Sequence, residues 1–98
     1  MSATEPVNVR VLDREYTVGV ETEGRDALMS AARLLDARMR EVRGANRMAA
    51  VDRVAVLAAL NLAHELEQLR NEQGQRERDL ARAVTELQRR LDAAAEAG

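Results

Sequence analysis

Residues 49–95 read AAVDRVAVLAALNLAHELEQLRNEQGQRERDLARAVTELQRRLDAAA, and this stretch decides the fold. It contains no proline, and Gly74 is its only strong helix-weakening residue. As one helix it would be about 70 Å long, because each residue adds ~1.5 Å. The residues before it form a head too small to cover a helix of that length. We therefore predict a long projecting helix whose apolar stripe is buried against another copy of the chain.

The first part of this helix, residues 51–69, is densely apolar. So wide a stripe can pack against both the head and a partner helix. The residues predicted to self-associate at this end are Val54, Leu57, Leu60, Asn61 and His64. His64 is the only histidine, and its position four residues after Leu60 favours a structural role at an interface over a catalytic one.

The last part of the helix, residues 70–95, carries a narrower pattern. Steps of four, three, four and three residues separate Leu80, Val84, Leu87, Leu91 and Ala94. This spacing is typical of a coiled-coil seam. Residues 71–79 contain no apolar side chain. The seam therefore either continues there with polar core positions or is interrupted by a flexible joint at Gly74.

Apolar and polar residues alternate between residues 7 and 20. The apolar positions are Val7, Val9 and Val11, followed by Tyr16, Val18 and Val20. A period of two on β-branched residues predicts a hairpin, with its turn near Asp13-Arg14. That turn lacks the glycine or asparagine of common two-residue hairpins. Residues 1–6 are expected to form a flexible N-terminus.

A first helix is predicted from about Arg25 to Arg43, with Thr22 as its N-cap and Gly44 as its stop. Its apolar stripe can cover one face of the hairpin, which is marginal alone. The predicted class is α+β and oligomeric. A head at residues 7–48, made of the hairpin and one helix, precedes a long helix at residues 49–95. This helix packs on the head at residues 51–69 and forms a coiled coil at residues 70–95.

The composition excludes several classes of protein. The chain has no cysteine, no phosphate-binding glycine loop and no pair of histidines at metal-ligand spacing. We therefore expect no enzyme activity, no cofactor and no metal site. No apolar run approaches the roughly 18 residues of a membrane span, and no targeting segment is evident, so a cytoplasmic protein without membrane contact is predicted.

One local concentration of charge stands out in a chain whose net charge is −2. Residues 33–47 contain five arginines against two acidic residues. These arginines are Arg33, Arg38, Arg40, Arg43 and Arg47. They form either an ordinary solvated helix face or a docking patch for an acidic partner, since guanidinium groups bind carboxylates in a two-pronged geometry.

The sequence resembles the ZapA family of bacterial cell-division proteins. The stretch DRVAVLAALNLAHEL, residues 52–66, is similar to the most recognisable block of that family. Residues 9–16, VRVLDREY, resemble its first hairpin, and residues 31–39, AARLLDARM, its first helix. The resemblance covers residues 7–69 in the right order. Beyond residue 69 the chain is similar only in its coiled-coil pattern.

This resemblance implies a non-enzymatic protein that binds the tubulin-like GTPase FtsZ and bundles its filaments at the mid-cell division ring. It implies dimerisation through the head and the start of the long helix, and a dimer of dimers through the coiled coil. Arg14, Arg43 and Arg47 match the family positions implicated in FtsZ contact, and Arg40 lies in the same charged region. ZapB, a coiled-coil protein that some members contact, is a second implied partner.

Two other functions stay open on the residues alone. The first helix, connector and second helix could be a helix-turn-helix variant in a nucleic-acid-associated dimer. The negative net charge and the single aromatic residue argue against nucleic-acid binding, which we do not expect. The chain could also be a generic coiled-coil scaffold of an unrelated assembly. It would then self-associate without responding to FtsZ.

Overall fold

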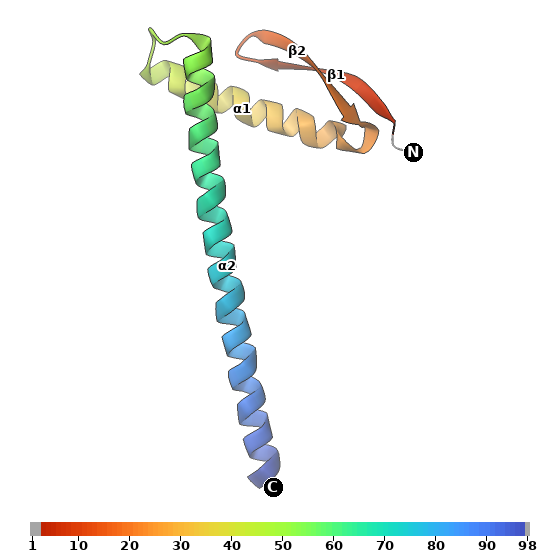
Figure 1. Ribbon diagram of the computed structural model, residues 1–98, viewed down its shortest axis with the longest axis vertical. Coiled ribbons are helices and arrows are strands. Elements are labelled where there is room, and N and C mark those ends of the chain that lie inside the picture. Colours follow the sequence, from red (N-terminus) through yellow and green to blue (C-terminus); the bar gives the residue numbers. More distant parts are fainter. Residues whose placement is uncertain (1–2, 98) are drawn as a thin grey trace. The chain divides into compact units, whose positions relative to one another are not determined.

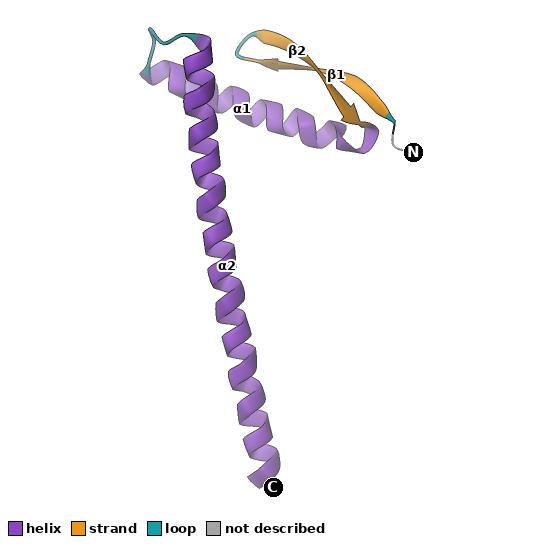
Figure 2. Cartoon of the chain, viewed as in Figure 1, coloured by secondary structure: helices purple, strands orange, loops and turns teal. Residues whose placement is uncertain are grey.

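The computed structural model describes residues 3–97 as a β-hairpin followed by two α-helices (Figure 1, Figure 2). Strand β1 (Thr4–Val11) and strand β2 (Arg14–Glu21) form the antiparallel hairpin. A short 3₁₀ helix, η1 (Thr22–Gly24), leads into α1 (Arg25–Ala45), and α2 spans Val51–Ala97. The predicted α+β class, a hairpin and one helix followed by a long helix, is confirmed.

Two compact units divide the chain within α2. The first unit ends at Leu62 and holds the hairpin, α1 and the first turns of α2. The second unit begins at Ala63 and holds the remainder of α2. The two units are described separately below.

The hairpin begins earlier than predicted. β1 starts at Thr4, so residues 4–6 belong to the strand rather than to a flexible N-terminus, while residues 1 and 2 lie outside the described residues. Pro6 pairs with Gly19 in the register. A two-stranded ribbon has only edge strands, where proline is tolerated, and this explains why Pro6 does not end the strand.

The core of the first unit is small and is filled mainly by β1 and the two helices. Its buried residues are Val7, Val9, Val11, Leu12, Ala32, Met39, Val54 and Ala58. Val54 and Ala58 of α2 are completely buried. Val54 was predicted to take part in self-association, and the structure places its side chain in the chain's own core.

Both ends of α1 differ from the prediction. Thr22 lies in η1, and Gly24 is the N-cap residue without a side-chain hydrogen bond. The helix continues through Gly44 to Ala45 and ends at Asn46. The side-chain amide and the backbone N–H of Asn46 both donate to the Val42 carbonyl, at 3.1 and 3.0 Å. Asparagine rather than glycine therefore satisfies the last carbonyls of this helix.

Helix α2 is continuous through Gly74. It begins at Val51, two residues after the predicted start, because Ala49 donates its backbone N–H to Asn46 in the connector. Polar side chains three or four residues apart support the stretch around Gly74, as in the 2.9 Å hydrogen bond from Gln75 to Asp79. The helix therefore has no joint at Gly74. Among the described residues, no helix is long and apolar enough to cross a bilayer.

Candidate functional site

The hairpin turn is built from two residues in a left-handed backbone conformation. Val11 pairs with Arg14, which leaves Leu12 and Asp13 as the loop. Their φ angles are 51° and 67°, as a type I′ turn requires. The prediction placed the turn near Asp13-Arg14, one residue too late, because leucine is rarely found at the first position of this turn. Arg14 is instead the first residue of β2.

Charged side chains from α1 hold this turn. The backbone N–H of Leu12 donates to Oδ1 of Asp36 at 2.8 Å, and Nε of Arg40 donates to Oδ2 of the same carboxylate at 2.9 Å. Nη2 of Arg40 also donates to Oδ1 of Asp13 at 2.9 Å. The four residues Leu12, Asp13, Asp36 and Arg40 form what we call the turn clamp. Arg40 was predicted to contact a partner, and the structure places it within this clamp.

The acidic groups of the turn clamp are stabilised in their charged form. The hydrogen bond from Arg40 lowers the pKa of Asp13 below its ordinary value. The same guanidinium, followed by the Leu12 N–H, lowers the pKa of Asp36. The two carboxylates in turn raise the pKa of Arg40. All three groups are therefore charged at neutral pH.

Two further arginines lie near the turn clamp. The positive charge of Arg43 contributes to the lowered pKa of both Asp13 and Asp36, and that of Arg10 to the lowered pKa of Asp13. Arg43 was predicted as a partner contact, whereas Arg10 was missed. Its position follows from the register, which places Arg10 opposite Glu15 beside the turn. Arg47 is exposed in the connector after α1. Within residues 3–97, Arg43 and Arg47 form no salt bridge.

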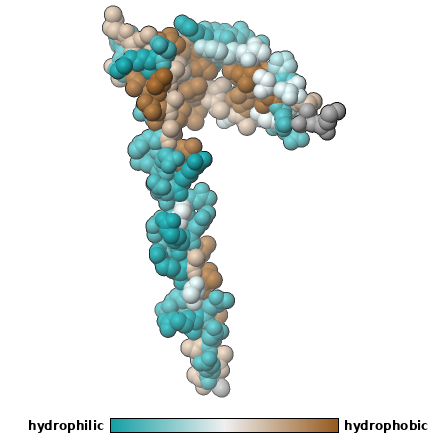
Figure 3. Space-filling view, in the orientation of Figure 1, coloured by the Kyte–Doolittle hydropathy of each residue, from teal (hydrophilic) through white to brown (hydrophobic). Residues whose placement is uncertain are grey.

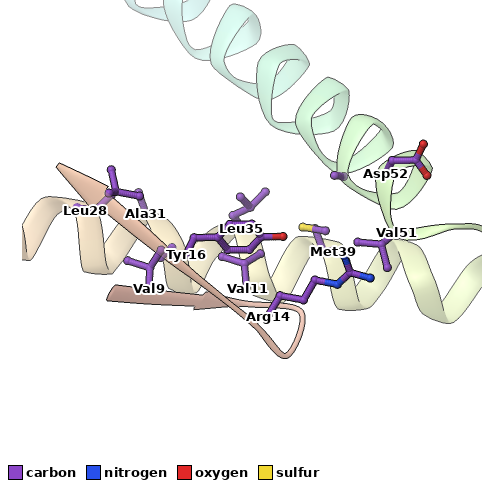
Figure 4. A pocket seen from close by; sticks show the side chains of 13 residues that line it. Val9, Val11, Arg14, Tyr16, Leu28, Ala31, Leu35, Met39, Val51 and Asp52 are labelled. Atoms are coloured by element: carbon purple, nitrogen blue, oxygen red, sulfur yellow. The ribbon is translucent and has the colours of Figure 1, made fainter. Parts of the chain in front are cut away.

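Arg14 lies on the opposite side of the hairpin from Arg10. Cross-strand partners share a face, so Arg14 points to the same face as Val11, its partner in the register. Figure 4 shows its side chain reaching toward Met39 and Val51. The structure therefore places Arg14 at an apolar groove, and Arg40 and Arg43 near Asp13 of the turn.

This groove is open, mostly apolar, and has a volume of about 570 Å³. It lies between the inner face of the hairpin, α1 and the first turn and a half of α2 (Figure 4). Tyr16 and Val18 of β2, at one side of it, are 47% and 37% exposed, whereas their partners Val9 and Val7 on β1 are buried. α1 thus covers β1 and leaves the apolar face of β2 open. The alternation of apolar residues in β2 indicates that this strand has an apolar face. It does not indicate that α1 leaves that face uncovered.

The residues predicted for self-association at the start of α2 are mostly exposed within one chain. Leu57 and Asn61 line a second, smaller groove together with Val42 and Asn46. Leu60 is 61% exposed, and His64 is exposed. Val54 alone among these five residues is fully enclosed by the chain itself.

The second unit carries the predicted coiled-coil seam on its surface. Leu80, Val84, Leu87 and Leu91 are each more than half exposed. Figure 3 shows brown side chains gathered over the first unit, whereas residues of the second unit are mostly teal with separate brown patches. Arg89 and Glu86 form a 2.7 Å ion pair in the same region, and this pairing lowers the pKa of Glu86. An exposed leucine row with paired charges beside it is typical of a helix that meets another helix.

Residues 3–97 contain no buried charged or polar side chain, and no group of three or more histidine, cysteine, aspartate or glutamate residues that could hold a metal ion. The candidate interaction surfaces of the first unit are the arginine-rich turn and the apolar groove. The candidate interaction surface of the second unit is the exposed leucine row.

Comparison with known proteins decides the family. The family model described as Cell division protein ZapA matches residues 7–96. The chain belongs to the ZapA family. The ZapA proteins it matches include that of Pseudomonas aeruginosa, which is 39% identical over 94 residues, or 96% of this chain and 90% of the relative. The ZapA of Pectobacterium carotovorum is 30% identical over 94 residues, or 96% and 85% of the two chains.

A solved structure has the same fold. It is described as an unknown conserved bacterial protein from Pseudomonas aeruginosa PAO1, and it is 39% identical to this chain. The TM-score is 0.71, with 89% of this chain and 96% of that chain covered. Membership of the ZapA family places the chain among cell-division proteins and confirms the resemblance found in residues 7–69.

Proposed function

We propose that this ZapA chain binds FtsZ and crosslinks its filaments at the mid-cell division ring, without catalysing a reaction. The observation that carries this proposal is the presence of two different surfaces on one chain. The first unit has an arginine-rich turn suited to an acidic partner. The second unit has an exposed leucine seam suited to another copy.

The docking chemistry rests on arginines that keep donors available. Arg43 and Arg47 form no salt bridge within residues 3–97, so their guanidinium groups can each bind a carboxylate of FtsZ in two-pronged geometry. Arg10 lies beside the same turn. Arg14 contributes from the edge of the groove. Arg40 supports the turn from within the clamp and makes the weakest candidate for direct contact.

Self-association supplies the second part of the function. Tyr16, Val18 and Leu60 leave apolar surface open on the first unit, which suits a dimer. The leucine seam of the second unit suits pairing of two dimers. An assembly with more than one FtsZ-binding turn can hold two filaments, and each added contact raises the avidity without any new chemistry. A coiled-coil partner such as ZapB would meet the same helix.

Co-pelleting with GTP-assembled FtsZ tests the docking surface. We expect the native chain to pellet with FtsZ, and a variant with Arg14, Arg43 and Arg47 changed to alanine to lose most of this binding. The matched control changes Arg70, Arg82 and Arg89 to alanine. It removes the same charge from exposed positions on α2, where each of these arginines pairs with an acidic residue three positions before it.

The control should pellet like the native chain. Equal losses in the two variants would show that net charge, rather than the turn region, drives the interaction. If the native chain fails to pellet, the chain is better explained as a scaffold for a different assembly.

A further inference from the structure

The hairpin turn places Leu12 in a backbone conformation that leucine does not favour. Leu12 and Asp13 have φ angles of 51° and 67°. A leucine rarely adopts the left-handed conformation, because its Cβ crowds the backbone. Asparagine and glycine, which adopt it readily, occur in neither position. Contacts from outside the hairpin must therefore select this turn.

The turn clamp supplies those contacts. Oδ1 of Asp36 accepts the Leu12 N–H at 2.8 Å, and its second oxygen accepts from Arg40, which also binds Asp13. Each of the two left-handed residues is thus tied to α1, one through its backbone and one through its side chain. The Leu12 side chain is only 4% exposed, and its burial in the core also holds the turn in place.

The clamp also fixes the arginines around the turn. Arg14 directly follows the Leu12-Asp13 loop, and Arg10 lies two residues before it. The two arginines point to opposite faces of the hairpin. A change of turn type that shifted the register by one residue would exchange these faces. Arg43 stands on α1, seven residues after Asp36 and close enough to lower the pKa of its carboxylate. Asp36 therefore fixes the positions of the hairpin arginines relative to α1, because it binds the turn that lies between them.

We propose that Asp36 is a positioning residue for partner binding: by holding Leu12 and Asp13 in the left-handed conformation, it sets Arg10 and Arg14 relative to Arg43. This inference rests on the proposed function, since FtsZ is the partner whose binding it would control. Asp36 itself need not touch FtsZ. Asp36 affects FtsZ binding by fixing the conformation of the turn.

The test combines two measurements on three variants of the full chain. The first measurement is hydrogen exchange of the Leu12 amide, and the second is the affinity for GTP-assembled FtsZ. Asp36→Ala should speed exchange at Leu12 and weaken FtsZ binding, each by about tenfold, because a hydrogen bond to a charged acceptor is lost. Asp36→Asn keeps an oxygen that can accept the Leu12 N–H. Its amide nitrogen replaces the oxygen that accepts from Arg40, so that contact is lost while the Leu12 contact stays, and both measurements should fall between those of the native chain and Asp36→Ala.

The third variant adds Asp13→Gly to Asp36→Ala. Glycine adopts positive φ without a tether, so we expect this change to recover most of the lost FtsZ affinity even though the Asp36 carboxylate is absent. Sedimentation and circular dichroism of all three variants confirm that each is folded and assembled. A role of Asp36 in general stability would not be rescued by a glycine in the turn.

Three results would overturn the proposal. In the first, Asp36→Ala binds FtsZ as tightly as the native chain despite faster exchange at Leu12. In the second, Asp36→Asn is as weak as Asp36→Ala, which would assign the effect to the charge. In the third, Asp13→Gly gives no recovery. If the native chain itself does not bind FtsZ, the proposed function fails and the positioning role fails with it, while exchange at Leu12 still reports whether Asp36 holds the turn.

Discussion

Leu87→Asp should split the native assembly into particles of half its mass. Leu87 lies in the middle of the seam formed by Leu80, Val84, Leu87 and Leu91, and its side chain is exposed within one chain. A helix seam this narrow depends on every apolar layer, and a carboxylate in the central layer would have to lose its water without gaining a partner. Sedimentation velocity measures the change directly, with a tetramer expected for the native chain and a dimer for the variant.

A control for this experiment lies two residues away. Thr85 is exposed on α2, and its hydroxyl donates to the Ala81 carbonyl of the same helix at 3.0 Å. It stands outside the four-and-three spacing of the seam. Thr85→Asp introduces the same charge and should leave the mass unchanged. Equal sedimentation of native chain and Leu87→Asp would remove the seam from the account.

Val54→Asp should abolish the cooperative folding of the first unit. Val54 is completely buried among residues of β1, α1 and α2. Burying a carboxylate there costs several kcal/mol, a large part of the ~5–15 kcal/mol by which a typical domain is stable. Val54→Ala, which only leaves a cavity, should cost about 2 kcal/mol. Thermal unfolding measures both variants, and hydrogen exchange in β1 shows whether the hairpin is retained.

Arg53→Asp is the matched control for Val54→Asp. Arg53 is the exposed neighbour of Val54 in the first turn of α2, where a negative charge is favoured by the helix dipole. This variant should unfold like the native chain. A cooperative transition of normal height in Val54→Asp would mean that Val54 is not enclosed by its own chain.

The elements of this fold could be predicted from the sequence because each depends on a local period. The alternation of Val7, Val9 and Val11 indicated a strand, and the spacing of Leu80, Val84, Leu87 and Leu91 indicated a seam. The strand and the helix are present in the structure, whereas the seam stays a prediction. The helical residues of α2 are interrupted only by a glycine that a helix tolerates.

The details that could not be predicted depend on contacts between elements distant in sequence. The turn falls at Leu12-Asp13 because Asp36, 24 residues away from Leu12, accepts its N–H. The end of α1 is a local exception: the helix continues past Gly44 to Ala45, and Asn46 caps it through a hydrogen bond to the Val42 carbonyl. The apolar pattern of α2 did not indicate that the Val54 side chain would be buried and the Leu60 side chain exposed, since both residues lie in the apolar part of the helix.

The arginines show the same limit. The local excess of positive charge could be predicted from the sequence, but the different contacts of the individual arginines could not. Arg40 binds two carboxylates of the turn clamp, Arg14 turns toward the groove, and Arg43 stays beside the turn. Which of several neighbouring arginines remains available is decided by the carboxylates that the fold brings to them, and these come from other elements.

Low-speed pelleting of GTP-assembled FtsZ shows whether this chain crosslinks the filaments. Bundled filaments sediment at low speed, whereas single filaments need high speed. We predict that the native chain moves FtsZ into the low-speed pellet, and that Leu87→Asp still binds filaments at high speed but no longer bundles them. The account would be contradicted if the native chain bound FtsZ and left it all in the low-speed supernatant, or if Leu87→Asp were halved in mass and still bundled filaments like the native chain.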